Sequence, residues 1–126
     1  KNNRSEIQKT NNNTIILDAY NANPSSMKSM LYSFAKQKYN NKMCILGDML
    51  ELGKQTEKEH KSIIKLTKDL SLNCFFIGRE FADISKNGFK NKKEFKSFLI
   101  KNPIKNKTIL IKGSRKIGLE ELLNSL

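Results

Sequence analysis

The sequence predicts an α/β domain of three layers, in which a mostly parallel β-sheet lies between two layers of helices. Four short apolar runs show no alternation with polar residues, which is typical of strands buried on both faces. Helical patterns separate these runs, and such alternation implies right-handed crossovers between parallel strands. A chain of 126 residues is long enough for one domain with its own core. The four predicted strands are residues 14–18, 43–47, 73–78 and 108–112.

An outer strand and the first helix are predicted at the start of the chain. Residues 5–10 form the outer strand, which the asparagine turn at 11–13 joins to the next strand. Asn23 is the expected N-cap of a helix at 24–39, and Pro24 takes its first position, where a missing N–H costs nothing. The apolar stripe of this helix has helical spacing and consists of Met27, Met30, Leu31 and Phe34.

The later helices are predicted from a cap and from apolar stripes. Thr56 and Glu59 have the spacing of a capping box, so a helix is expected to begin at Thr56. Shorter helices are predicted near residues 80–85 and 92–99. A last helix is predicted from Gly118, with a stripe of Leu119, Leu122, Leu123 and Leu126.

The net charge of +12 raises the question of a nucleic-acid ligand, because basic faces attract phosphate groups. Of the 24 basic residues, 21 are lysines that are scattered along the chain. The sequence has no RNA-recognition aromatic pair, zinc-finger spacing or glycine-rich clamp. This composition argues against nucleic acid, and a stand-alone basic module that binds nucleic acid or another anionic partner is kept as the alternative.

Cys44 and Cys74 each lie inside an apolar run, so we expect reduced core cysteines in a cytoplasmic protein. The apolar runs are a handful of residues long, far short of the roughly 20 that cross a bilayer, and no signal peptide is recognisable.

Charged and glycine residues follow the predicted strands, and in an open parallel sheet the ligand crevice lies at these carboxyl ends. Each feature also has a purely structural explanation: Asp18 could cap a turn, Asn23-Pro24 could simply start a helix, and the glycines could serve loops. Their expected convergence on one edge favours a binding site. The residues are Asp18, Tyr20, Asn21 and Asn23; Gly47, Asp48 and Glu51; Gly78 and Arg79; and Lys112, Gly113, Ser114 and Arg115.

Three motifs of other protein classes are not present. The stretch GDMLELGK at 47–54 has five residues between its glycines, where a phosphate-binding loop has four, and Gln55 replaces the required Ser or Thr. No G-x-G-x-x-G follows the first strand, which argues against a free-standing oxidoreductase. His60, the single histidine, has no partner at metal spacing and is expected to be a partly exposed helix residue without a direct role.

Three ordered motifs resemble the C-terminal domain of the Mur ligases. They are LDAYNANPSSM at 17–27, ILGDMLELG at 45–53 and IKGSR at 111–115. The asparagine-rich first motif is most similar to the branch that adds D-alanyl-D-alanine to UDP-N-acetylmuramoyl-tripeptide in peptidoglycan synthesis. The resemblance implies a Rossmann-like domain, the third of a three-domain ATP-dependent enzyme, with residues 1–5 as the hinge to a central domain.

In such ligases ATP activates a carboxylate as an acyl phosphate, which the amine of D-alanyl-D-alanine attacks, and the central domain holds the Mg2+ and the triphosphate. The isolated domain is therefore expected to be inactive. By the same resemblance, Arg4, Asp18, Tyr20 and Asn21 are ATP-binding, while Lys112, Gly113, Ser114 and Arg115 line the dipeptide pocket. A forked cation beside backbone donors suits a carboxylate. Our own inference from the residues adds Asp48 and Glu51 as partners of the dipeptide ammonium.

Overall fold

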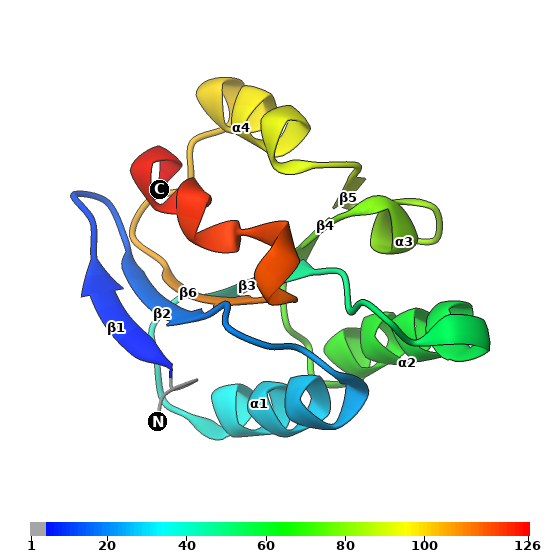
Figure 1. Ribbon diagram of the computed structural model, residues 1–126. Coiled ribbons are helices and arrows are strands. Elements are labelled where there is room, and N and C mark those ends of the chain that lie inside the picture. Colours follow the sequence, from blue (N-terminus) through cyan, green and yellow to red (C-terminus); the bar gives the residue numbers. More distant parts are fainter. Residues whose placement is uncertain (1–4) are drawn as a thin grey trace.

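The computed structural model describes residues 5–126 and contains a six-stranded sheet with the order β1-β2-β6-β3-β4-β5 (Figure 1). Every neighbouring pair is parallel except β1 with β2 at the edge. The four predicted inner strands and the outer strand are confirmed, whereas the two-residue β5 was not predicted. The strands are β1 (Glu6–Lys9), β2 (Thr14–Asp18), β3 (Lys42–Gly47), β4 (Cys74–Ile77), β5 (Gly88–Phe89) and β6 (Thr108–Lys112).

Helices cover both faces of the sheet, which confirms the predicted three layers (Figure 1). One face packs against α1 (Pro24–Lys36), α2 (Thr56–Asp69) and the short α3 (Arg79–Ala82). The other face packs against α4 (Lys92–Lys101) and the 3₁₀ helix η3 (Leu119–Ser125). Shorter 3₁₀ turns are η1 (Gly53–Gln55) and η2 (Arg115–Ile117).

The lack of alternation in the apolar runs follows from two separate cores. In β2, Ile16 faces the α1–α2 side and Ile15 faces the α4–η3 side. In β6, Leu110 faces the α1–α2 side and Ile109 faces the α4–η3 side. Successive side chains of a strand point to opposite faces, so a sheet covered on both sides needs an apolar residue at every position.

The helices α1 and α2 begin at Pro24 and Thr56, as predicted, but only the predicted cap of α1 is confirmed. Asn23 accepts a hydrogen bond from the Ser26 N–H (2.8 Å), and Ser26 Oγ accepts one in return from the Asn23 N–H (3.1 Å). The capping box predicted for Thr56 and Glu59 is wrong. The turn η1 brings the chain into α2 already in helical conformation, so Thr56 is the first residue of the helix instead of its cap, and its hydroxyl donates to the Gly53 carbonyl (2.8 Å).

The last predicted helix is a 3₁₀ helix, and the short helix near 80–85 is the single turn α3. Leu119, Leu122 and Leu126 are buried as the stripe predicts, and Leu123 is half-buried. Of the helices at residues 5–126, none has the length and apolar character that a bilayer span requires.

The two cysteines are free thiols in the core, as predicted, and lie opposite each other in the β3–β4 ladder. The hydrogen bond that the Cys44 thiol makes to Cys74, followed by burial, raises the pKa of Cys44 well above its usual value near 9.0. Cys44 therefore stays protonated in the folded protein through the neutral range.

Candidate functional site

The candidate site lies at the edge where the parallel strands β2, β6, β3 and β4 end. The ladder pairs Asp18 with Lys112 and Lys112 with Leu46, which fixes the three loops that follow β2, β6 and β3 side by side. A backbone hydrogen bond from the Ser114 N–H to the Asp48 carbonyl (3.1 Å) joins two of these loops. The predicted convergence of the strand ends is therefore present.

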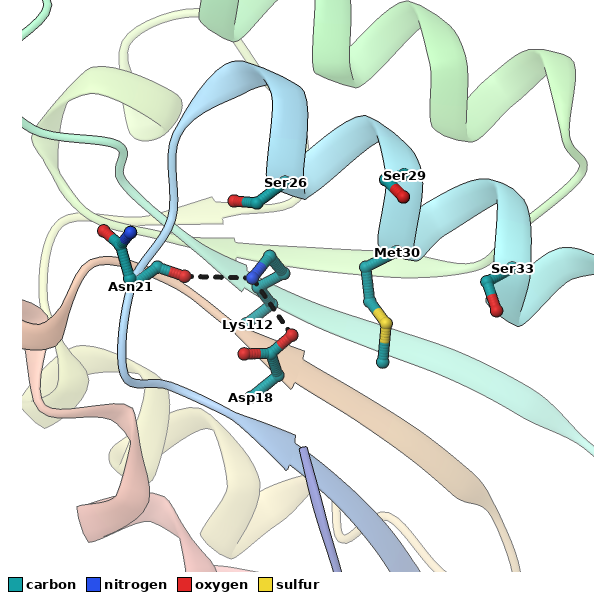
Figure 2. A pocket seen from close by; sticks show the side chains of 7 residues that line it. All are labelled: Asp18, Asn21, Ser26, Ser29, Met30, Ser33 and Lys112. Atoms are coloured by element: carbon teal, nitrogen blue, oxygen red, sulfur yellow. Dashed lines mark hydrogen bonds and ion pairs between the residues drawn. The ribbon is translucent and has the colours of Figure 1, made fainter. Parts of the chain in front are cut away.

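The centre of this edge is an ion pair between Asp18 and Lys112 (Figure 2). Lys112 Nζ donates to Asp18 Oδ2 at 3.0 Å and to the Asn21 carbonyl at 2.9 Å. Lys112 is only 2% exposed, although it was predicted to line the dipeptide pocket. Its ammonium group is held by the loop that was predicted to bind ATP.

A cleft of about 330 Å³ opens above this ion pair, between the strand ends and the flank of α1 (Figure 2). Its floor contains Asp18 and Lys112, and its wall is a row of α1 side chains that our sequence interpretation did not assign to the site. Their spacing of three and four residues puts them on one helix flank, and this signal could have identified them. The wall residues are Ser26, Ser29, Met30 and Ser33.

Tyr20 and Arg115 form a second contact between the two predicted ligand loops. The Arg115 guanidinium carbon lies 5.1 Å from the centre of the Tyr20 ring, within the range of a cation–π interaction. Both side chains are exposed, Tyr20 by 49%. Together with Glu6 and Glu120 they line a smaller cleft of about 250 Å³. Arg115 is thus available to a ligand.

Asp48 has a structural environment that was not predicted. It is 3% exposed, and its two carboxylate oxygens accept the backbone N–H groups of Glu80 and Phe81, each at 3.0 Å. These N–H groups belong to the first turn of α3, whose free donors favour an acid. The geometry therefore makes Asp48 a cap of α3 and leaves it poorly suited to the dipeptide ammonium, whereas Glu51 lies exposed in the loop.

The expectation of a partly exposed His60 is wrong, because the side chain is fully buried. Its Nε2 accepts the Met49 N–H at 3.1 Å, so the proton is on Nδ1, which donates to the Thr56 carbonyl at 2.7 Å. The ring also packs edge-on against Phe81, with centroids 4.6 Å apart. His60 thus fixes the loop after β3 to α2. The missed signal was its position one turn before Ile63 on the buried stripe.

Two glycines let the loops after β3 and β6 pack directly against each other. A Cβ atom on Gly113 would lie 2.9 Å from the Gly47 Cα and 2.7 Å from a Leu119 methyl carbon. Gly113 is buried, while Ser114 is half-buried and closer to solvent. Arg4, the remaining predicted site residue, lies outside the described residues.

The family model described as "Mur ligase, glutamate ligase domain" matches residues 3–115 of the chain. The UDP-N-acetylmuramoyl-tripeptide--D-alanyl-D-alanine ligase of Bacillus subtilis is 35% identical over 98% of this chain. The chain spans about 30% of the length of the curated relatives that it matches.

Two solved structures share the fold. The MurF ligase of Thermotoga maritima, in complex with ADP, matches 98% of the chain and 30% of its own length, with a TM-score of 0.78 at 21% identity. MurF from Acinetobacter baumannii matches 100% of the chain and 30% of its own length, with a TM-score of 0.77 at 27% identity. The family match over most of the sequence, on a fold of this kind, shows that the chain belongs to the Mur ligase family.

Proposed function

We propose that the chain is the C-terminal domain of an ATP-dependent ligase that adds D-alanyl-D-alanine to UDP-N-acetylmuramoyl-tripeptide in the cytoplasm. The observation that carries this proposal is the adjacency of the Asp18 and Arg115 loops at one sheet edge. One loop suits a nucleotide and the other suits a carboxylate, and a ligase needs both near the reacting atoms. The names of the relatives that match nearly the whole chain support the same assignment.

In this proposal Arg115 and Ser114 hold the carboxylate of the dipeptide, because a guanidinium fork and nearby polar donors match its two oxygens. Gly113 contributes by the close backbone packing that positions Ser114. Glu51 is the group we assign to the dipeptide ammonium, and Asp48 is left to its structural role.

Asp18, Tyr20, Asn21 and, in the hinge, Arg4 face ATP in this proposal. The domain's main contribution is proximity: it brings the amine within about 3–3.5 Å of the acyl phosphate, which can supply several kcal/mol of the barrier. Closing over the nucleotide also excludes water, which strengthens each polar contact.

The Mg2+ ion and the triphosphate belong to a preceding central domain in this proposal. Among residues 5–126, no three His, Cys, Asp or Glu side chains gather in one cluster. Asp18, the acid nearest the cleft, is paired with Lys112.

The test is steady-state kinetics of the full-length protein that carries this domain, with Arg115→Ala and Asp18→Ala. Arg115→Ala should raise the Michaelis constant for D-alanyl-D-alanine about tenfold or more and leave that for ATP within about twofold, because one charged contact is lost. Asp18→Ala should mainly harm ATP use or turnover.

The matched control is Lys116→Ala, which removes an exposed cation next to Arg115. It should leave both Michaelis constants unchanged. Equal and small effects of Arg115→Ala and Asp18→Ala would contradict the site assignment. Absence of dipeptide-dependent ATP turnover in the unaltered protein would contradict the proposed activity itself.

A further inference from the structure

We propose that Lys112 is a positioning residue, which orients the loop between β2 and α1 and does not itself bind the dipeptide. This inference rests on the proposed function, since it names what Lys112 does within that site. It changes the role that the motif IKGSR suggested for its lysine.

Burial is the first argument. Lys112 is 2% exposed, and its side chain ends against Asp18 Oδ2 (3.0 Å) and the Asn21 carbonyl (2.9 Å). A dipeptide carboxylate would have to compete with both acceptors for an ammonium that is already enclosed. Arg115, three residues further along the chain, is exposed and needs no such rearrangement.

The position of Lys112 in the sheet is the second argument. Lys112 is the last residue of β6 and pairs in register with Asp18, the last residue of β2. Lys112 also pairs with Leu46 of β3 on its other side. Its backbone is therefore fixed by two neighbouring strands, which makes its ammonium group a rigid anchor for a loop.

The hydrogen bonding of the loop is the third argument. Among residues 5–126, the side-chain hydrogen bonds to segment 18–22 all come from Lys112. One bond orients the Asp18 carboxylate and the other holds the backbone at Asn21, so a single ammonium group sets the direction of both. Figure 2 shows the ammonium between these two acceptors, on the side of the cleft.

Energetics favour a positioning role over a stabilising one. A buried ion pair loses in desolvation much of what it gains in attraction, so its net contribution to stability is often small. Such a pair can instead hold a loop in one conformation, because any conformation that separates the two groups leaves a buried charge without its partner, which is costly. We therefore expect the loss of Lys112 to alter the Asp18 loop more than the dipeptide pocket.

The experiment compares Lys112→Met with Lys42→Met in the full-length ligase. Lys42 is a matched control, since its ammonium also ties backbone carbonyls, those of Ala35 and Gln37 at 2.7 Å each, but at the opposite end of the sheet. Lys112→Met should raise the Michaelis constant for ATP about tenfold and change that for D-alanyl-D-alanine less than about twofold. Lys42→Met should lower stability only.

A double variant separates action through Asp18 from an independent effect. If Lys112 acts through Asp18, then adding Lys112→Met to Asp18→Asn should raise the Michaelis constant for ATP little further, so the two effects are not additive. Lys112→Gln keeps an N–H donor and should recover part of the loss. It also serves as the second variant if Lys112→Met does not fold.

Two results would overturn the inference. A rise in the Michaelis constant for the dipeptide that equals or exceeds the rise for ATP would make Lys112 a dipeptide ligand. Unchanged amide exchange of segment 19–22 in Lys112→Met, measured by mass spectrometry, would show that the lysine does not order the loop. Because amide exchange needs no turnover, it still tests the inference if the proposed activity fails.

Discussion

At the scale of single residues, Asp48 and Gly78 form one unit. Gly78 has φ +127 and ψ 160, a region that is almost restricted to glycine, and it immediately precedes α3. The missing Cβ leaves the space that the Asp48 carboxylate fills, since a Cβ there would lie 2.3 Å from its carbon. The carboxylate then reaches the first N–H groups of α3.

Gly78→Ala should lower the free energy of unfolding of the 126-residue chain by about 3 kcal/mol or more, through backbone strain together with displacement of Asp48. Gly53→Ala is the matched control, because Gly53 also has a positive φ (+59), but among residues 5–126 no atom beyond its chain neighbours would lie within 4 Å of an added Cβ. It should cost about 1 kcal/mol. Urea unfolding measures both, and equal losses would contradict the proposed packing.

The difference between Asp18 and Asp48 explains why the site was only partly predictable. Asp18 ends a buried strand and Asp48 directly follows one, so the sequence pattern does not distinguish the two acids. What separates them is the group opposite: the first turn of α3 for Asp48 and the buried Lys112 for Asp18. These pairings join residues that are 32 and 94 positions apart in the sequence. The sequence therefore predicted which edge of the sheet holds the site, but it did not predict which side chains at that edge are already paired and which are free to bind a ligand.

At the scale of elements, the strands were the most predictable part of the fold, because burial on both faces makes each inner strand a continuous apolar run. The strand β5 has two residues and no such signal. The cap of α2 was wrongly predicted because the preceding turn η1 makes Gln55 the residue before the helix and Thr56 its first residue. The local sequence does not show that a 3₁₀ turn leads directly into the helix.

The paired strands β3 and β4 should give the chain a pH-dependent stability. The Cys74 hydrogen bond and burial raise the pKa of Cys44 in the folded state, whereas the unfolded chain ionises this thiol near its usual value of 9.0. Above that pH the unfolded state binds fewer protons than the folded state, so stability falls as pH rises, by up to about 1.4 kcal/mol per pH unit. Below pH 9 this contribution to stability is fully present.

Urea unfolding at about pH 8 to 10 measures this slope. Cys44→Ser is the control, since its hydroxyl does not titrate there and can keep a hydrogen bond to Cys74. Its stability should fall less steeply above pH 9 than that of the unaltered chain. The same slope in both proteins would show that Cys44 is not the group responsible.

At the scale of the whole molecule, the net charge of +12 is the property that the ligase assignment does not use. Several lysines are engaged within the fold: Lys112 with Asp18, Lys92 with Glu121, Lys61 with Glu57 and Lys65 with Asp69. Nucleic-acid grooves are commonly built with arginine, and the chain has three arginines among its 24 basic residues. The net charge therefore predicts a non-specific attraction of the protein to polyanions, but it does not predict a binding site shaped for one of them.

The alternative function as a nucleic-acid module makes a prediction of its own, which a salt titration can separate from ours. We expect the chain to bind a short DNA duplex or RNA only non-specifically, with a dissociation constant of about 10⁻⁴ to 10⁻⁶ M at physiological salt that weakens steeply as salt rises. Exposed lysines would cause this binding by releasing counterions, so Arg115→Ala should change it no more than Lys116→Ala. The contrary result would be submicromolar, sequence-selective binding at physiological salt that is lost in Arg115→Ala. It would mean that the sheet edge at Arg115 recognises nucleic acid, because a shaped site distinguishes one base sequence from another and scattered charge does not.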